Sequence, residues 1–201
     1  MTKKQKVLRL NDGTEILSYK DAISIAKKRK TFNLLVRDLI LLLLYAKKDK
    51  PIYGRTMLMK QVFLLFEEIL KKYDLKIQNP KFVPYRYGPY SFTVAKVAED
   101  LAFAGYIKIE GKKNAKKERF IITDEGIREI EKKWKRLSES LKKEIKNHRI
   151  SWDQMGPNGI LKYVYTYYPA FKVKSKIKDK YKDIKWGRGK GENVLKIQKG
   201  D

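Results

Sequence analysis

Apolar residues recur at helical spacing along much of the chain. The run LLVRDLILLLLYA predicts a helix over residues 34–46. Pro51 and Gly54 interrupt the pattern, and we expect Thr56 to cap a second helix. That helix should turn one apolar stripe inward, formed by Leu58, Val62, Leu65, Phe66 and Ile69. A third helix is expected after Ser91, a favourable cap, with Val94, Val97, Leu101 and Ala104 on its inner face.

The segments after the third helix change to the alternating pattern of strands. YIKIE and RFIIT each alternate apolar and polar residues, and the lysine-rich turn GKKNAKK separates them. Thr123 then caps a long helix, with Asp124 and Glu125 favourably placed in its first turn. Three helices, a two-stranded wing and a closing helix predict a mainly α (α+β) winged helix-turn-helix core.

Turn-forming segments divide the chain into four parts. VLRLNDGTEILSY predicts a short hairpin around Asn11–Asp12–Gly13, and Ser18 is expected to cap a short basic helix. SWDQMGPNG, at 151–159, is the clearest internal boundary, and YVYTYYP beyond it should pack back on the helical core. The expected parts are an N-terminal hairpin with its helix, the winged-helix domain with its long closing helix, a C-terminal helical extension and a flexible basic tail, at 1–32, 33–150, 151–186 and 187–201.

Three segments resemble a known family when they are taken in order. They are YGRTMLMKQVFLL, FVPYRYGPYSFTVAKVAEDLAFAGYIK and LKYVYTYYPAF. Over roughly residues 33–175 the chain resembles the Panacea, or SocA-like, antitoxin domain and the related uncharacterised YwgA-like proteins. The Tyr-Gly-Pro-Tyr-Ser element at 87–91 and the Val-Tyr-x-x-Tyr-Pro element at 164–169 are the most specific parts. The resemblance implies a helical, winged-helix-like core, no enzymatic activity, and a role in neutralising a toxin or in regulation.

The charge of the chain indicates a polyanionic partner. Its 201 residues contain 48 Lys and Arg against 23 Asp and Glu, a formal net charge of +25. A charge of this size repels itself unless a polyanion or counterions screen it. Nucleic acid is therefore the first candidate partner, and an anionic membrane surface is the second.

Composition also limits the chemistry. With no cysteine and His148 as the single histidine, thiolate sites, His-based zinc sites and Ser/His/Asp triads are excluded or nearly so. His148 is expected at a helix end, solvated or facing the helix dipole. The adjacent acids Glu67/Glu68 and Glu99/Asp100 diverge around their helices, so neither pair predicts acid–base catalysis. We expect no enzyme, no metal and no cofactor.

The longest apolar run is too short to span a bilayer and contains Arg37 and Asp38. No targeting segment is evident, because the N-terminus lacks an apolar signal core. We therefore expect a cytoplasmic protein that does not enter a membrane. High Lys, Glu and Ile without Cys are typical of a thermophile.

The wing is the best candidate for contact with phosphates. Its turn and edge gather five cations within a few residues: Lys112, Lys113, Lys116, Lys117 and Arg119. The third helix offers Thr93 and Lys96, followed by Glu99 and Asp100, which would face phosphates unfavourably. We therefore expect contact with the phosphate backbone rather than reading of bases.

The loop FVPYRYGPYSF, at 82–92, carries unusual aromatic surface between the second and third helices. Pro89 fixes the backbone before the cap, and Gly88 allows a turn that other residues resist. At least one of its tyrosines should pack beneath the turn. Tyr87 and Tyr90, if exposed beside Arg86, suit stacking on bases or a protein interface.

The long helix after Thr123 repeats apolar residues at nearly heptad spacing. Two interpretations are open: this face lies on the core, or it pairs with a second copy. In the second case a homodimer would form through Ile130, Trp134, Leu137 and Leu141.

The tail contains WGRGKGE, in which Arg188 and Lys190 alternate with glycine, a pattern found in segments that order on RNA. The sequence thus predicts a winged-helix protein that binds nucleic acid mainly through charge, with DNA as default target and a regulatory role. One alternative is a structured-RNA or ribosome-associated factor. The other is an antitoxin-like protein that binds and neutralises a partner protein.

Overall fold

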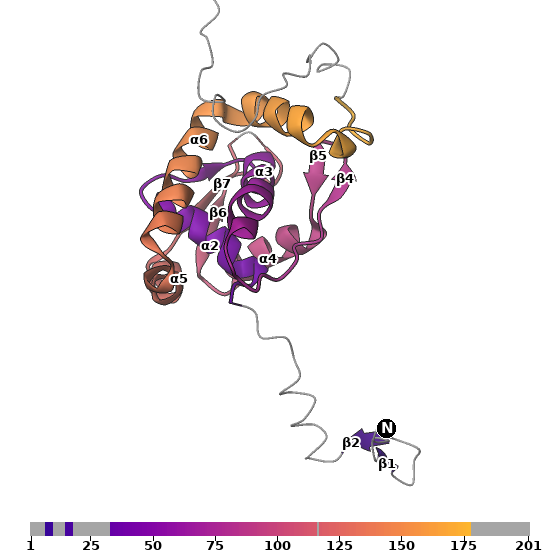
Figure 1. Cartoon of the computed structure of the whole chain (residues 1–201), viewed down its shortest axis with the longest axis vertical. Coiled ribbons are helices and arrows are strands. Elements are labelled where there is room, and N and C mark those ends of the chain that lie inside the picture. The colour runs from indigo at the N-terminus through magenta and orange to yellow at the C-terminus, as the bar shows by residue number, and fades with distance from the viewer. Residues whose placement is uncertain (1–6, 10–14, 18–32, 116, 178–201) are drawn as a thin grey trace, which may run out of the picture. The chain divides into compact units, whose positions relative to one another are not determined.

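The computed structural model describes residues 7–9, 15–17, 33–115 and 117–177 (Figure 1). The chain forms two compact units, Met1–Asn33 and Leu34–Asp201. In the first unit, β1 (Val7–Arg9) and β2 (Glu15–Leu17) pair antiparallel. The strands of the expected hairpin are confirmed. Its turn at 11–13 and the expected basic helix with its cap Ser18 lie outside the described residues.

The first long helix of the second unit is α2 (Val36–Ala46), as predicted. It is buried on nearly every side from Val36 through Leu44, which explains why, apart from Arg37 and Asp38, its residues are apolar. Asp38 is buried with it and pairs with Lys133 Nζ at 2.5 Å. Among the described residues, no helix has both the length and the apolar composition needed to cross a membrane.

The second helix, α3 (Arg55–Leu64), begins earlier than predicted. Its N-cap is Gly54 rather than Thr56, and no side chain caps it. Gly54 has φ of 79°, which only glycine adopts readily, and its carbonyl accepts the Leu58 N–H. The helix continues into a π-helical turn, η1 (Leu65–Ile69), and a 3₁₀ turn, η2 (Leu70–Lys72). The predicted apolar stripe is buried throughout.

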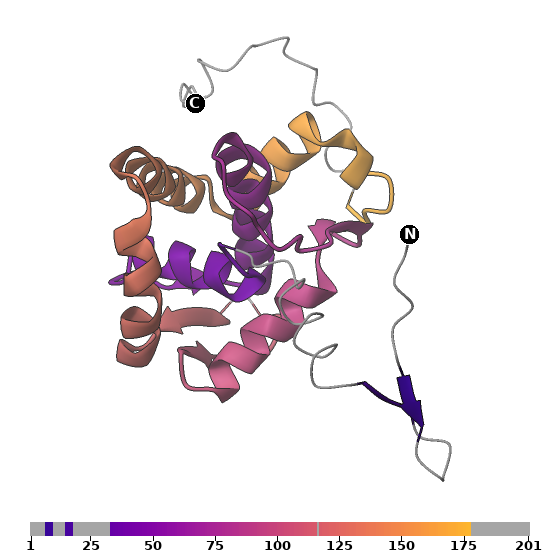
Figure 2. The ribbon, with the colours of Figure 1, turned by 60° about the horizontal axis from the view of Figure 1, so that its bottom comes forward.

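The aromatic segment predicted as a loop is a β-hairpin of β4 (Val83–Tyr85) and β5 (Gly88–Tyr90). It leads into α4 (Phe92–Phe103), whose N-cap is Ser91, as predicted. Figure 2 shows α4 leading away from the hairpin.

The two strands predicted for the wing are β6 (Ile107–Glu110) and β7 (Arg119–Ile122), and they pair antiparallel. A third strand, β3 (Ile52–Tyr53), joins the other edge of β7, giving the order β3-β7-β6. The sequence analysis did not identify β3, because two residues are too few to show an alternating pattern.

The single long helix predicted after Thr123 is wrong. Thr123 caps α5 (Asp124–Arg136), but Leu137 is extended, with ψ of 149°. Ser138 then caps a second helix, α6 (Glu139–Tyr167), by accepting the Leu141 N–H. A serine cap followed by an acidic first turn favours a new helix start over continuation.

The boundary segment expected at 151–159 lies within α6. The helix bends inside this segment, at Gly156, where φ is 62°, and Pro157 starts the part of α6 that follows (Figure 1). Beyond the bend, Ile160, Leu161, Val164 and Tyr165 are buried, and the 3₁₀ turn η3 (Pro169–Phe171) follows. The expected packing of this extension on the core is confirmed for its described part. His148 lies inside α6 rather than at a helix end, and burial lowers its pKa.

The face that could have paired with a second copy is part of the core. None of its four residues, Ile130, Trp134, Leu137 and Leu141, is more than 9% exposed, so little of their surface remains for a second copy. The burial supports the interpretation in which this face lies on the core. The second unit is thus mainly helical, with a small antiparallel sheet, consistent with an α+β protein.

Candidate nucleic-acid interface

The β4–β5 hairpin is fixed to the interior by glycine packing and by a buried lysine. Gly88 has φ of 81°, and a Cβ there would lie 2.9 Å from Cε1 of Tyr165. The ammonium of Lys60, on α3, donates a hydrogen bond of 2.8 Å to the Pro89 carbonyl. Lys60 is only 2% exposed, and burial lowers its pKa to about 7. The inner side of the hairpin is therefore occupied by protein.

The hairpin also carries an aromatic cluster that continues onto α4. The rings of Tyr85, Tyr90 and Phe92 contact one another, with centroids 5.0 to 5.6 Å apart. Phe92 is nevertheless 62% exposed, and Tyr87 at the hairpin turn is also exposed. The Arg86 guanidinium lies 5.5 Å from the ring centre of Tyr85. As expected, one tyrosine of this segment, Tyr90, packs against the core, while an aromatic surface beside Arg86 remains accessible.

The two acids on the outer face of α4 are both neutralised. Glu99 pairs with Lys113 at 2.5 Å and with Arg55 at 3.2 Å. Asp100 pairs with Lys96, one turn earlier on the same helix, at 2.7 Å. The hydrogen bond from Lys113 holds the pKa of Glu99 below its usual value, with a smaller contribution from Arg55. In the sequence analysis, Glu99 and Asp100 counted against a nucleic-acid contact. In the structure, each of them has a cation beside it.

The wing turn, residues 111–118, is tied to α3 and α4 by the same cluster. Glu118 is fully buried and accepts a hydrogen bond of 2.8 Å from Arg55. Its second oxygen accepts the Asn114 N–H at 3.0 Å. Gly111 has φ of 86°, and a Cβ there would lie 2.6 Å from the Lys117 carbonyl oxygen. A buried ion pair and a close backbone crossing thus set the direction of the turn.

The lysines of the turn differ in how they are paired. Lys113 is bound to Glu99, and Arg119 to Glu110 at 2.5 Å. Lys112 and Lys117 are exposed, and within the described part of the chain no carboxylate pairs with either. Exposed pairs of this kind contribute about 0 to 1 kcal/mol, so a phosphate can compete for the paired cations too.

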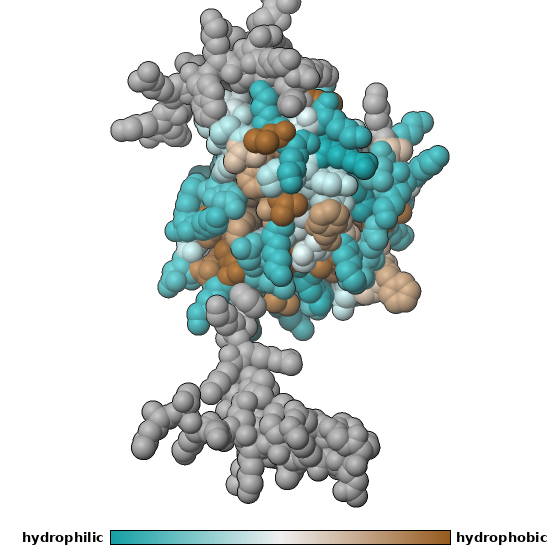
Figure 3. All heavy atoms as spheres, turned by 90° about the vertical axis from the view of Figure 1, so that its right-hand side faces the viewer, coloured by the Kyte–Doolittle hydropathy of each residue, from teal (hydrophilic) through white to brown (hydrophobic). Residues whose placement is uncertain are grey.

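Three segments are grouped here under the name α4 surface: the exposed aromatic part of the β4–β5 hairpin, the exposed face of α4, and the wing turn. The hairpin contacts α4 through Phe92, and the turn contacts it through Glu99. Figure 3 shows the side of the molecule that carries β4 and β5 in Figure 1, with apolar patches scattered among hydrophilic side chains. The described residues predicted for nucleic acid lie on these segments and at the start of β7: Arg86, Tyr87, Tyr90, Thr93, Lys96, Lys112, Lys113, Lys117 and Arg119. Lys116, Arg188 and Lys190 lie outside the described residues.

Sequence reasoning missed the three residues that position this surface, namely Lys60, Arg55 and Glu118. Each is a charged residue in a charged or amphipathic context, and nothing in the local pattern marks it as buried. Glu118 gives one weak signal, since it is an isolated acid in a run of lysines. Among the described residues, no group of three or more His, Asp or Glu side chains is placed to hold a metal ion.

No model of a known protein family matches the chain, and comparison with curated proteins finds no match.

Proposed function

We propose that this protein is a non-enzymatic, winged-helix-type protein that binds nucleic acid through phosphate contacts on the α4 surface. The element order supports this architecture: α2, β3, α3 and α4 precede the paired strands β6 and β7, and β3 completes their sheet. In this arrangement α4 takes the place of the recognition helix, and residues 111–118 take that of the wing.

The observation that carries the proposal is the pairing of Glu99 and Asp100 with cations. Without it, α4 would present two acids to the phosphates. With it, the acids of α4 are already balanced, and the two exposed lysines of the wing turn and Arg86 of the hairpin add positive charge to the α4 surface. Because phosphates carry no sequence information, binding should depend on salt far more than on sequence. Duplex DNA is the default ligand, and a regulatory role follows from it.

The test is a titration of labelled duplex DNA across a salt series. Each phosphate contact contributes about −0.9 to the slope of log affinity against log salt concentration. Changing Lys112 and Lys117 to Ala together should therefore flatten the slope by about 2 units. The matched control changes Lys132 and Lys143, two exposed lysines of α5 and α6, to Ala. It removes the same charge and should leave the slope nearly unchanged. Equal slopes in both double variants would show that the wing turn is not the contact.

The same series separates DNA from structured RNA. Removal of residues 187–201 should leave duplex binding nearly intact. If the deletion instead removes binding to a structured RNA while the wing variant has no effect, the RNA or ribosome-associated alternative replaces the DNA proposal. The second alternative, an antitoxin-like protein that neutralises a partner protein, is supported only by the resemblance described in the sequence analysis.

A further inference from the structure

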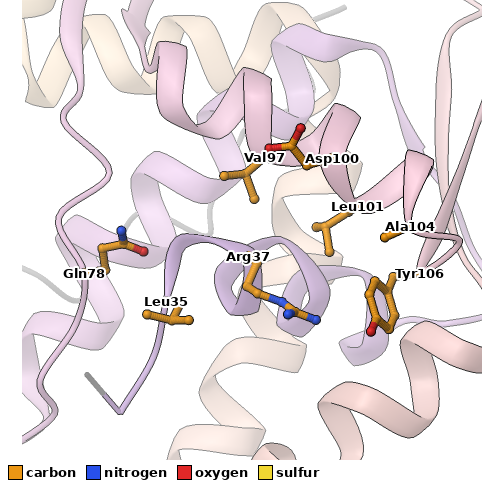
Figure 4. Close-up of a pocket in the computed structure, with 8 residues that line it drawn as sticks. All are labelled: Leu35, Arg37, Gln78, Val97, Asp100, Leu101, Ala104 and Tyr106. Atoms are coloured by element: carbon orange, nitrogen blue, oxygen red, sulfur yellow. The ribbon is translucent and has the colours of Figure 1, made fainter. Parts of the chain in front are cut away.

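An open pocket lies between the start of α2 and the side of α4 (Figure 4). Its volume is about 290 Å³. Most of its walls are apolar, contributed by Leu35, Val97, Leu101, Ala104 and the ring of Tyr106. Ligand sites for drug-sized molecules enclose about 300 to 1,000 Å³, so this pocket suits one large side chain better than a whole cofactor.

The polar side chains that line the pocket differ in whether their hydrogen-bonding groups already have partners. Gln78 accepts the Val36 N–H at 3.0 Å, and Asp100 is held by Lys96. Arg37 reaches from α2 toward Tyr106, as Figure 4 shows, and its guanidinium lies 4.9 Å from the centre of that ring. One of its terminal nitrogens, Nη2, donates to Glu129 at 3.1 Å.

The rest of the Arg37 guanidinium has no acceptor. Nε is buried without a hydrogen-bond partner, and within residues 33–115 and 117–177 no group accepts from Nη1. The side chain keeps a third of its surface exposed. Nη1 of Arg37 is therefore left for an acceptor on a ligand, while Glu129 and Tyr106 hold the side chain in place.

Phe103 adds a protruding side chain beside the pocket. It lies on α4, directly before the pocket residue Ala104, and is 97% exposed. A small ligand that filled the pocket would leave this ring in water. A partner surface that covered both would bury an aromatic side chain and fill an apolar hole, the combination found at energetically important centres of protein interfaces.

We propose that the Arg37–Phe103 surface, defined as the pocket together with Phe103, binds an acidic segment of a partner protein. The segment places one large apolar side chain in the pocket, packs against Phe103, and sets a carboxylate against Arg37. Acidity is expected on two grounds: Nη1 of Arg37 has no acceptor among the described residues, and the net charge of +25 favours association with negatively charged partners. The proposal does not depend on the nucleic-acid function, because Arg37 and Phe103 are not among the residues proposed to contact phosphates.

The test selects partner sequences without a prior identity. Helical peptides of about three turns, displayed as a random library, are selected on the full-length chain, and the enriched peptides are synthesised with a fluorescent label. We expect enrichment of one large apolar residue with Asp or Glu within the adjacent turn. Affinity is then measured by fluorescence anisotropy against purified variants whose folding is checked by circular dichroism.

Three variants probe the surface. Ala104→Phe fills the pocket, and Phe103→Ser removes the protruding ring; each should weaken the enriched peptides about tenfold. Arg37→Gln removes the charge and should weaken them about threefold, with the difference lost for peptides whose acids are changed to amides. Val173→Ser, which removes another highly exposed apolar side chain, is the matched control and should have no effect.

The outcomes separate the two proposals. Failure to enrich any peptide, or equal affinity for wild type, Ala104→Phe and Phe103→Ser, would overturn the protein-binding inference and leave the salt-slope result untouched. If these two variants weaken duplex DNA while no peptide binds, the Arg37–Phe103 surface belongs to the nucleic-acid contact instead.

Discussion

One interpretation of the sequence makes both the α4 surface and the apolar face of α5 and α6 binding surfaces. In the structure the first is accessible and the second is buried. On the α4 surface Phe92 remains largely exposed, and Arg86 lies over the ring of Tyr85, which contacts Phe92. On the α5–α6 face, the four residues Ile130, Trp134, Leu137 and Leu141 are covered by the chain itself. The contrast shows that a regular apolar stripe indicates burial without saying what buries it. Aromatic residues in a turn-rich segment are the better signal of an accessible surface.

The largest expected effect comes from a substitution on the buried apolar face of α5 and α6. Leu141→Glu places a charge where the structure leaves 2% exposure, and no cation in the apolar stripe compensates it. The free energy of unfolding should fall by about 4 kcal/mol or more. Chemical denaturation measures the change, and light scattering follows the oligomeric state. Lys143→Glu, on the exposed side of the same helix, is the control. A Leu141→Glu protein that is folded and monomeric, from a dimeric wild type, would restore the dimer interpretation.

Lys60 tests the inner side of the hairpin. Burial lowers the pKa of Lys60 from 10.5 to about 7, so between these values the unfolded chain binds more protons than the folded one. Stability should therefore rise with pH over this range, by up to about 1.4 kcal/mol per unit from this group. Lys60→Met keeps the aliphatic stem and removes the charge. It should raise the free energy of unfolding by about 3 kcal/mol at pH 7 and by much less near pH 10.

Urea denaturation of wild type and Lys60→Met at several pH values between 7 and 10 measures this difference. Lys132→Met, at an exposed position on α5, provides the control for loss of one lysine. Parallel pH profiles for wild type and Lys60→Met would mean that Lys60 keeps its ordinary pKa.

Two neighbouring tyrosines of the hairpin, Tyr87 and Tyr90, differ in how far they are buried. Tyr90 packs on the core and on the rings of Tyr85 and Phe92, whereas Tyr87 stands at the exposed turn. Tyr90→Ala should lower the free energy of unfolding by about 2 kcal/mol, and Tyr87→Ala by less than about 0.5 kcal/mol. Thermal melts with a binding titration measure both. Loss of duplex binding in Tyr87→Ala at unchanged stability would place that ring in the interface; if the two melts shift equally, the assigned division is wrong.

The smallest effect concerns the acids of α4. Glu99→Gln removes the carboxylate that pairs with Lys113, so one more cation becomes available to phosphate. Duplex affinity should rise about threefold, and the salt slope should steepen by about 0.9. Glu125→Gln, which breaks the exposed pair with Arg128 on α5, changes the net charge equally and should alter neither. Weaker binding by Glu99→Gln than by wild type would show that the pair shapes the wing turn rather than masking a cation.

Much of the second unit follows from sequence alone, because its signals are local. The helical apolar period located α2, α3 and α4. Ser91 and Thr123 each accept a backbone N–H of the helix that they start, as their residue types predict. Alternation located β6 and β7. Each of these features depends on contacts within a few residues, where residue type and spacing decide the outcome.

The tertiary structure decided what covers each apolar stripe and which charges meet. Arg55 joins Glu99 and Glu118, which lie 44 and 63 positions away, and Lys60 reaches a carbonyl 29 positions away. Such pairings arise only after packing brings distant segments together, and no local period records them. Leu137 shows the same limit, because an apolar residue in the right heptad position still left the helix once Ser138 offered a better start for α6. The sequence thus determined the elements and their inner faces, whereas packing determined which surfaces remained accessible and how their charges were balanced.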